Sequence, residues 1–352
     1  MSSYLYPKSR YQKLIDRRTP RELGGNIRLD ERIRNSSLSS ETVKYVLGSM
    51  TPVDPEYTAN TFKQGERVRG QLENNLPSTH AAEFAYQGSV TTDTHIKLYS
   101  DIDLLTVAKA FHCLKQPLQP TFPWAGDPVQ HLMELRGHGT RVLKEKFPQA
   151  KVDTTGSKAV AISEGSLTRS VDVVFCNWLD TEHYRMYGSD WRGIQILDTS
   201  GPTRVTNYPF LHKRRLDDVD RAVYGSLKKI IRFVKSVKAD ADVEIKVSSY
   251  HIAGLACSMA PADLMIDFGD ELKLVTNFYG YAQYLLANEP AREKLMTPNG
   301  HEPLFKGIEL SALQRLVTEI APIAEEIKAF QFYGYGLARA SISSVFRDLA
   351  SR

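Results

Sequence analysis

Two acidic side chains, Asp101 and Asp103, stand two residues apart at the start of the apolar run DIDLL. Residues two apart in a strand point to the same side, so this spacing presents both carboxylates together while Ile102 faces a core. Two carboxylates on one face repel each other unless a cation lies between them. Hard oxygen ligands held in this way suit Mg²⁺ that bridges the phosphates of a nucleotide. The alternative is a strand that carries two solvated aspartates.

A Gly-Ser pair, Gly88 and Ser89, precedes the two aspartates. Glycine allows backbone N–H groups to approach a phosphate closely, and the serine hydroxyl adds a hydrogen-bond donor. A phosphate-binding turn followed by a metal-binding pair is what nucleotidyl transfer requires. The pair therefore favours a nucleotide site over two solvated aspartates.

A third acidic residue, Asp172, interrupts the β-branched run SVDVVF. This run and the segment 159–162 flank a Ser-Glu-Gly-Ser sequence, a pattern typical of a hairpin. An aspartate in a buried strand is costly unless it has a partner. That partner is either the metal beside Asp101 and Asp103, or an arginine in a salt bridge.

The composition of the 352 residues is ordinary for a globular protein, with 42% hydrophobic and 24% charged residues. No apolar run approaches the length of a membrane span and the start lacks a signal-peptide core, so we expect a cytoplasmic protein. Three isolated cysteines, Cys113, Cys176 and Cys257, argue against a disulfide framework or a zinc site. The formal charge of +4 suits a pocket for polyanionic nucleotides without requiring DNA or RNA.

The periodicity of apolar residues predicts an α+β chain with two lobes. We expect a mixed α/β lobe over 1–205, with an N-terminal arm and a long spine helix at 57–74, and a helical lobe over 206–352. The basic arm either packs on the body, is solvated or contacts nucleic acid. The expected strands lie at 101–105, 159–162, 171–175 and 193–197. The other expected helices lie at 11–17, 129–147, 218–238, 273–288, 311–331 and 337–349, with one more that begins at 247–251 and is capped by Ser248 or Ser249.

Five short segments carry a resemblance to a known family. They are Gly88-Ser89, Asp101-Ile102-Asp103, Ser170-Val171-Asp172-Val173-Val174, Leu227-Lys228 and Ser248-Ser249-Tyr250-His251. Their order and spacing resemble the DNA polymerase β-like nucleotidyltransferase superfamily, and within it the cGAS/DncV-like nucleotidyltransferases (CD-NTases). The resemblance implies a polymerase-β-like core of a mixed twisted sheet with helices. It also implies a helical second lobe similar to that of oligoadenylate synthases, with the active site in the cleft between the two.

The resemblance implies catalytic roles for the three aspartates. Asp101 and Asp103 would hold two Mg²⁺ ions, with Mn²⁺ as a substitute. Asp172 would complete the second metal site and help to activate the attacking ribose hydroxyl. An acceptor hydroxyl would then attack the α-phosphate of the donor, and pyrophosphate would leave.

Nucleotide-binding roles follow from the same resemblance. Gly88 and Ser89 would hold the donor triphosphate together with Lys228 and Ser249 of the helical lobe. Tyr250 would stack on the donor base. A lysine on a helix that faces the cleft neutralises phosphate charge as a point cation. The alternatives are a Lys228 whose stem packs along the surface and a Tyr250 in the core.

Base choice has one candidate residue, Asn207, which lies where the chain is expected to cross between the lobes. Its amide can both donate and accept at a base edge. We expect ATP as a substrate, with GTP, UTP or CTP as the second base.

The resemblance implies a bacterial antiphage (CBASS) cyclase that makes a cyclic di- or oligonucleotide second messenger, which activates a separate effector protein. A regulatory protein partner is a further expectation, and no membrane partner is expected. Activation by DNA is not expected, because three scattered cysteines do not form the zinc ribbon with which the animal members grip DNA.

Three other functions share parts of this pattern. One is a nucleotidyltransferase that modifies a tRNA, a protein or an antibiotic, and another is a non-catalytic nucleotide- or RNA-binding module on the same fold. The third is synthesis of linear 2′-5′ oligomers triggered by double-stranded RNA. The set of three aspartates argues against the non-catalytic module.

Overall fold

The computed structural model of the chain describes residues 9–18, 40–96, 101–333 and 342–343. The chain divides into two compact units. The sheet unit comprises Asp54–Asp93 and Tyr99–Arg215, and the helical unit comprises Met1–Val53, Thr94–Leu98 and Leu216–Arg352. The boundary at Arg215 differs from the predicted division after residue 205, and the described residues before Asp54 group with the helices instead of the sheet.

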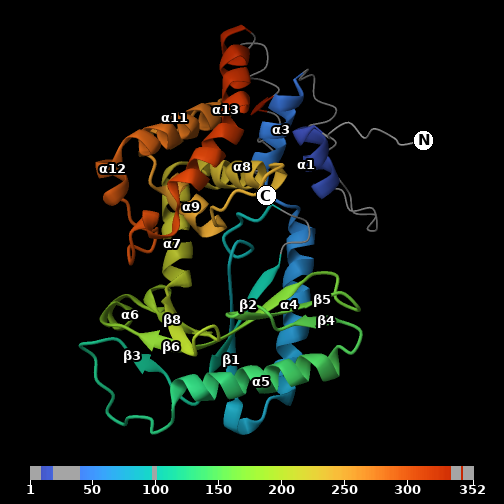
Figure 1. Cartoon of the computed structure of the whole chain (residues 1–352), viewed down its shortest axis with the longest axis vertical. Helices are drawn as coiled ribbons and strands as arrows, with labels where there is room; N and C mark the ends of the chain where they lie inside the picture. Colours follow the sequence, from blue (N-terminus) through green and yellow to red (C-terminus); the bar gives the residue numbers. More distant parts are fainter. Residues whose placement is uncertain (1–8, 19–39, 97–100, 334–341, 344–352) are drawn as a thin grey trace. The chain divides into compact units, whose positions relative to one another are not determined.

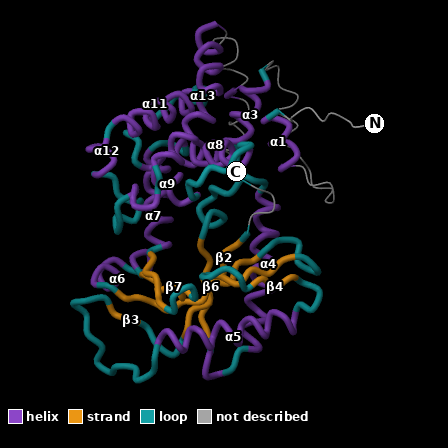
Figure 2. The backbone as a smooth tube through the Cα atoms, in the orientation of Figure 1, coloured by secondary structure: helices purple, strands orange, loops and turns teal. Residues whose placement is uncertain are grey.

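Eight strands form one mixed sheet within the described part of the sheet unit, and Figure 2 shows most of them together in orange. They are β1 (Ala82–Gln87), β2 (Ile102–Ala108), β3 (Cys113–Leu114), β4 (Lys151–Asp153), β5 (Ala159–Ser163), β6 (Val171–Asp180), β7 (Gly193–Asp198) and β8 (Thr203–Asn207). The order β1-β2-β6-β5-β4 runs across the sheet, while β3 and β7 also pair with β6, and β8 pairs with β7. The predicted pairing of β5 with β6 is confirmed as antiparallel.

The central pair, β2 and β6, is parallel and separates two apolar cores. Ile102 and Leu104 of β2 belong to one core, which also contains residues of helices α4 (Pro55–Asn75) and α5 (Pro128–Lys146). Figure 1 shows these two helices beside the sheet. Leu105 and Val107 belong to the core on the other face. Because side chains alternate along a strand, Asp103 shares the face of Leu105, opposite the two helices.

The two helices begin in the same way. Asp54 precedes Pro55 and accepts hydrogen bonds from the next two backbone N–H groups, and Asp127 does the same before Pro128. An N-cap aspartate followed by proline at the first helical position is a strong start signal. The spine helix α4 is therefore confirmed, with its end at Asn75.

The helical unit has its core around α8 (Ser226–Asp240), of which eleven residues are buried. The other helices described there are α1 (Arg10–Arg18), α3 (Glu41–Met50), α9 (Ser249–Cys257), α10 (Pro261–Leu264), α11 (Lys273–Ala287), α12 (Glu289–Glu293) and α13 (Leu310–Tyr333). Helix α7 (Pro209–Ala222) begins in the sheet unit and continues into the helical unit. The helix predicted at 337–349 lies almost wholly outside the described residues.

The single helix predicted over 218–238 is wrong, because the structure divides it into α7 and α8. Tyr224 and Gly225, with φ of 53° and 84°, stand at the break. A left-handed glycine ends the first helix and starts the second in a new direction. The apolar spacing continues across the break, which is why it predicted one element.

The N-terminal arm is packed on the body in its described part, as one of the alternatives predicted. Arg17 forms an ion pair of 2.5 Å with Asp240, and Arg18 donates two hydrogen bonds to Thr51. These two arginines are therefore engaged within the helical unit. Among the described residues, no helix is long and apolar enough to cross a membrane.

Candidate active site

Asp103 and Asp172 are direct neighbours, because the parallel register of β2 and β6 pairs one with the other. The register is fixed by the Ile102 backbone N–H, which donates to the Ser170 carbonyl at 3.3 Å. Asp101 stands immediately before β2, because the strand begins one residue later than the predicted 101–105. The structure thus brings together, at the beginning of two adjacent parallel strands, the three aspartates that the sequence singled out.

Gly88 lies against one of these carboxylates. It follows the last residue of β1, Gln87, which pairs with Asp103. Its φ is +87°, and a Cβ added to it would lie 2.0 Å from the Asp103 Oδ2 atom. Glycine is therefore required here both by the backbone conformation and by the closeness of Asp103.

A tight turn follows Gly88 and contains Ser89. The Thr91 hydroxyl donates to the Gly88 carbonyl at 2.8 Å, and the Thr92 hydroxyl donates to the Ser89 carbonyl at 3.2 Å. Both carbonyl groups are therefore bonded to side chains of the same turn. Backbone N–H groups arranged in such turns form concave sites for anions.

Burial and neighbouring carboxylates raise the pKa of two of these side chains, Asp103 and Asp172. Burial, then the charges of Asp172 and Asp101, raise the pKa of Asp103 to about 7. Burial, then the charge of Asp101, raises the pKa of Asp172 to about 6. Among the described residues, no lysine or arginine pairs with Asp172, so the salt-bridge alternative does not hold. Crowded carboxylates with raised pKa values are typical of sites that gain a cation.

The chemistry of the three side chains fits Mg²⁺, since they supply hard oxygen donors alone. Within the described residues, no group of three or more His, Cys, Asp or Glu side chains is already arranged to hold a metal ion. A divalent ion at the aspartates would remove the repulsion that raises the two pKa values.

Lys228 is near the start of α8 and is paired inside the helical unit. Its Nζ lies 2.7 Å from the Asp217 carboxylate and 4.0 Å from that of Asp220. The Lys228 backbone N–H also donates to Asp220, at 2.9 Å. The alternative of a lysine packed along the surface is not what the structure shows. The ammonium is engaged by two aspartates that the sequence analysis did not consider.

Ser249 and Tyr250 form the first turn of α9. Ser248, rather than Ser249, caps this helix, because its hydroxyl accepts the His251 backbone N–H at 3.2 Å. Ser249 is exposed. Tyr250 is half-buried, with its ring edge-on to the His251 ring at 5.6 Å. Burial raises the pKa of the Tyr250 hydroxyl, which also forms hydrogen bonds to Thr297 and Asn299.

Asn207 is the last residue of β8, within the sheet unit. Its side-chain carbonyl accepts the backbone N–H of Tyr208 at 2.8 Å. This oxygen is therefore used locally, whereas the amide N–H₂ group is the part available to a ligand. The chain leaves the sheet unit eight residues later than Asn207, at Arg215.

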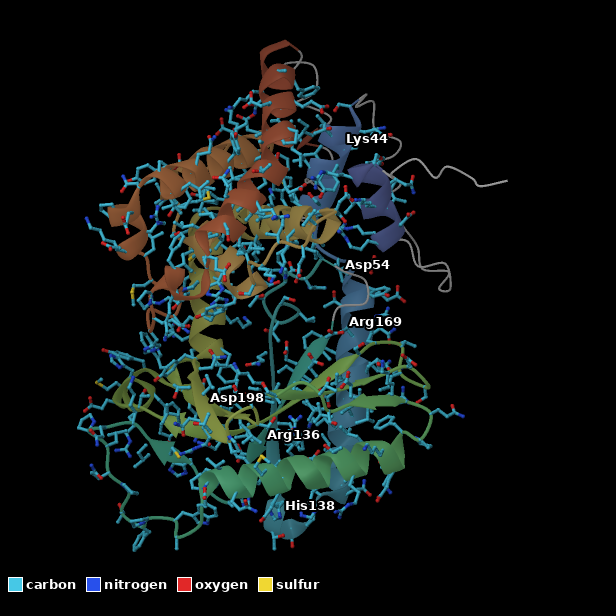
Figure 3. All side chains as sticks on the ribbon, in the orientation of Figure 1. Lys44, Asp54, Arg136, His138, Arg169 and Asp198 are labelled. Atoms are coloured by element: carbon cyan, nitrogen blue, oxygen red, sulfur yellow. The ribbon has the colours of Figure 1, made fainter. Side chains whose placement is uncertain are left out.

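Arg169 is a residue beside the site that sequence reasoning missed. Arg169, labelled in Figure 3, is 2% exposed, and its guanidinium lies 3.7 Å from the centre of the Tyr57 ring. It directly precedes Ser170, whose carbonyl fixes the register of the two central strands. The signal was present in the sequence, as a charged residue adjoining the buried run SVDVVF.

Comparison with known proteins decides the family. A cyclic dinucleotide synthase CdnE of Yersinia aleksiciae is 33% identical over 303 residues, which is 84% of this chain and 79% of the relative. A c-di-GMP synthase of a Lachnospiraceae bacterium is 30% identical over 93% of this chain and 100% of the relative. This chain belongs to the CD-NTase family. No family model matches it.

Solved structures agree with this assignment. The STING-associated CdnE c-di-GMP synthase of Capnocytophaga granulosa has 30% identity and a TM-score of 0.75, with 91% of this chain and 98% of that chain covered. The Rhodothermus marinus CdnE c-UMP-AMP synthase has a TM-score of 0.62 at 17% identity, over 82% of this chain and 96% of that chain, and shows likeness of fold alone. The predicted α+β, polymerase-β-like fold is confirmed. This CD-NTase is a nucleotidyltransferase that synthesises a cyclic oligonucleotide.

Proposed function

We propose that this CD-NTase joins two molecules of GTP into cyclic di-GMP and releases two pyrophosphates. Three relatives carry the name c-di-GMP synthase; each is 26–30% identical to this chain and aligns with it over most of its own length. The observation of this structure that supports the reaction is the register that pairs Asp103 with Asp172 beside Gly88. The relatives favour GTP in both positions over the ATP that the sequence analysis expected.

Asp101, Asp103 and Asp172 would hold two Mg²⁺ ions, or Mn²⁺ in their place. Bound there, Mg²⁺ would supply positive charge to the triphosphate and lower the pKa of the attacking ribose hydroxyl. The Asp172 carboxylate, which the parallel register places beside Asp103, would accept the proton of that hydroxyl. The backbone N–H groups of the turn after Gly88 and the Ser89 hydroxyl would bind and orient the phosphates.

Two similar transfers make the ring. In each, a bond forms between a ribose oxygen and an α-phosphorus, and the bond from that phosphorus to the pyrophosphate oxygen breaks. The ribose proton passes to a carboxylate and then to water. Lys228, Ser249 and Tyr250 of the helical unit would hold the donor triphosphate and its base. For Lys228 this requires the triphosphate to replace Asp217 as the partner of the ammonium. Asn207, through its amide N–H₂ group, is our candidate for reading a base.

The product would act as a second messenger in antiphage signalling. Two of the similar solved structures are described as STING-associated, and these are c-di-GMP synthases. We therefore propose an effector protein that is activated by a cyclic dinucleotide as the receiver of the product, and place the reaction in the cytoplasm. A regulatory protein that switches the enzyme on remains a prediction.

The test is incubation of the purified protein with the four labelled ribonucleoside triphosphates, singly and together, with Mg²⁺ or Mn²⁺. Treatment with phosphatase and mass spectrometry then identify the product. We expect a phosphatase-resistant cyclic di-GMP from GTP alone, and none from the double variant Asp101→Ala/Asp103→Ala. Glu145→Gln, a change of an exposed carboxylate on α5, is the matched control and should leave the product unchanged.

A resistant product that contains adenine, uracil or cytosine would contradict GTP as the sole substrate while leaving the reaction class intact. Label on a tRNA, a protein or an antibiotic in a cell extract would contradict synthesis of a small cyclic product. A ladder of linear products that depends on double-stranded RNA would also contradict it.

A further inference from the structure

Three cations follow one another along α8 at spacings of four and three residues, Lys228, Arg232 and Lys235. Residues at these spacings share one face of a helix. Each of them contacts a segment of the helical unit next to a point where the chain passes between the units. Lys228 pairs with Asp217 at 2.7 Å, Arg232 donates to the Met50 carbonyl at 2.8 Å and Lys235 donates to the Thr94 carbonyl at 2.7 Å.

Lys235 is the least expected of the three. It is 7% exposed, and the acceptor that the structure shows for its ammonium is a backbone carbonyl rather than a carboxylate. Burial, then the positive charges of Arg232 and Lys238, lower its pKa to about 7. A buried cation without a carboxylate is unfavourable, and an apolar side chain of similar volume usually stabilises such a position better. The presence of lysine at this position therefore points to a use for the hydrogen bond to Thr94.

The segment that Lys235 holds is short and connects two parts of the proposed active site. The chain passes from the sheet unit to the helical unit between Asp93 and Thr94. Along the sequence, the Gly88 turn lies on one side of this segment and Asp101 on the other. Thr94, His95 and Ile96 are 3–6% exposed. These three residues are thus buried in the helical unit, while Asp93 directly before them belongs to the sheet unit.

We propose that Lys235 is a positioning residue for nucleotidyl transfer. Through Thr94 it fixes the residues that follow the phosphate-binding turn, and so sets where that turn can lie when nucleotide is bound. Displacement of a catalytic or binding group by about 1 Å lowers a rate by orders of magnitude, so an anchor directly after the turn has a large effect. This inference rests on the proposed function for its kinetic part and on the contact with Thr94 for its structural part.

The variant Lys235→Met tests both parts, because methionine keeps most of the apolar stem and removes the ammonium. Arg136→Met is the matched control. Arg136, labelled in Figure 3, is 8% exposed and donates to the carbonyls of Thr154 and Gly156 in the sheet unit. Both changes remove a buried cation that donates to backbone carbonyl groups. Only Lys235→Met removes the hydrogen bond to Thr94.

The first measurement is amide hydrogen exchange of the intact, nucleotide-free protein. We expect Lys235→Met to speed exchange at Thr94–Ile96 by about 10-fold or more, the factor that corresponds to a charge-assisted hydrogen bond. In Arg136→Met, exchange at these amides should stay within about threefold of the wild type. Equal exchange in all three proteins would overturn the anchor, whether or not the wild type makes a product.

The second measurement is turnover at saturating nucleotide, with the product identified as for the wild type. We expect kcat of Lys235→Met to fall about 10-fold or more, with KM changed less than about threefold, as for a lost transition-state interaction. Faster exchange with unchanged kcat would overturn the positioning role. If Lys235→Met does not fold, Lys235→Arg replaces it. Because arginine keeps a donor, exchange at Thr94–Ile96 and kcat should then stay near the wild-type values. Faster exchange together with a lower kcat in Lys235→Arg would overturn the inference. If the wild type makes no product, the proposed function is refuted, and the hydrogen-exchange result alone decides whether Lys235 anchors Thr94.

Discussion

Asp103→Asn is expected to stabilise the metal-free protein, although it removes a proposed metal ligand. The folded-state pKa of Asp103 is about 7, against an ordinary value of 3.8. Below pH 3.8 the carboxyl is protonated in both the folded and the unfolded chain, so it costs nothing. As the pH rises from about 4 to about 7, the unfolded chain releases this proton first, and the free energy of unfolding falls. Above pH 7 the penalty is complete and constant.

The size of this penalty follows from the shift of about three pKa units. Each unit corresponds to 1.36 kcal/mol, which gives an upper limit of about 4 kcal/mol. Part of the shift is shared with Asp172 and Asp101, and the asparagine amide needs hydrogen-bond partners of its own. We therefore expect Asp103→Asn to raise the free energy of unfolding by about 2–4 kcal/mol at pH 8, and by close to nothing at pH 4. For a unit of this size, this corresponds to about 4–16 °C in melting temperature.

The assay is thermal unfolding in EDTA at pH 4, 6 and 8, repeated at pH 8 with Mg²⁺. Added Mg²⁺ should raise the melting temperature of the wild type and should have little effect on Asp103→Asn, because the ion relieves the same repulsion. Glu145→Gln, an exposed change, should behave as the wild type in every condition. The reasoning is refuted if Asp103→Asn is neutral or destabilising at pH 8 in EDTA, since that would show no repulsion at the site.

Three further predictions concern single residues. Gly88→Ala should lower turnover by about 100-fold, because its Cβ would meet Asp103, whereas Gly70→Ala, with open space around it, should leave turnover unchanged. Asp217→Asn should tighten binding of a fluorescent GTP analogue about three- to tenfold by releasing Lys228; weaker binding would contradict that role. Gly225→Ala should lower the free energy of unfolding in urea by about 1–2 kcal/mol, because φ there is 84°, and an unchanged midpoint would contradict it.

The sequence was sufficient for the elements whose signals are local. The spacing of Asp101 and Asp103 with Ile102 between them predicted the β2 face, and the structure buries Ile102 completely. Helices α4 and α5 were predicted from their apolar spacing, and the structure shows that each also has a local start signal, an N-cap aspartate before a proline. In these elements, neighbours along the chain decide the conformation, so periodicity and caps carry the information.

The division between α7 and α8 shows what local signals do not contain. Gly225 breaks the helix through its left-handed φ, while Leu227, Ile230 and Val234 continue the apolar spacing. The break allows Asp220 to accept the Lys228 backbone N–H, eight residues later. An uninterrupted helix would place these two groups about two turns apart. The ion pair of Lys228 with Asp217 depends on the same break between the helices. The sequence alone indicated neither this ion pair nor the hydrogen bond to Asp220.

Each unit by itself neutralises the charges that the reaction is proposed to use. In the sheet unit, raised pKa values allow Asp103 and Asp172 to share protons near neutral pH in the absence of metal. In the helical unit, Asp217 and Asp220 neutralise Lys228. A complex of Mg²⁺ with a nucleoside triphosphate carries both of the charges that would take over this neutralisation. The Mg²⁺ cation would replace the protons at the aspartates, and the triphosphate anion would replace the carboxylates at Lys228. The metal and the triphosphate should therefore bind with positive coupling. We therefore expect the wild type to bind GTP measurably more weakly without Mg²⁺ than with it. In Asp217→Asn, the affinity for GTP should depend less on Mg²⁺. Equal dependence of the GTP affinity on Mg²⁺ in both proteins would show that the two sets of charges act independently.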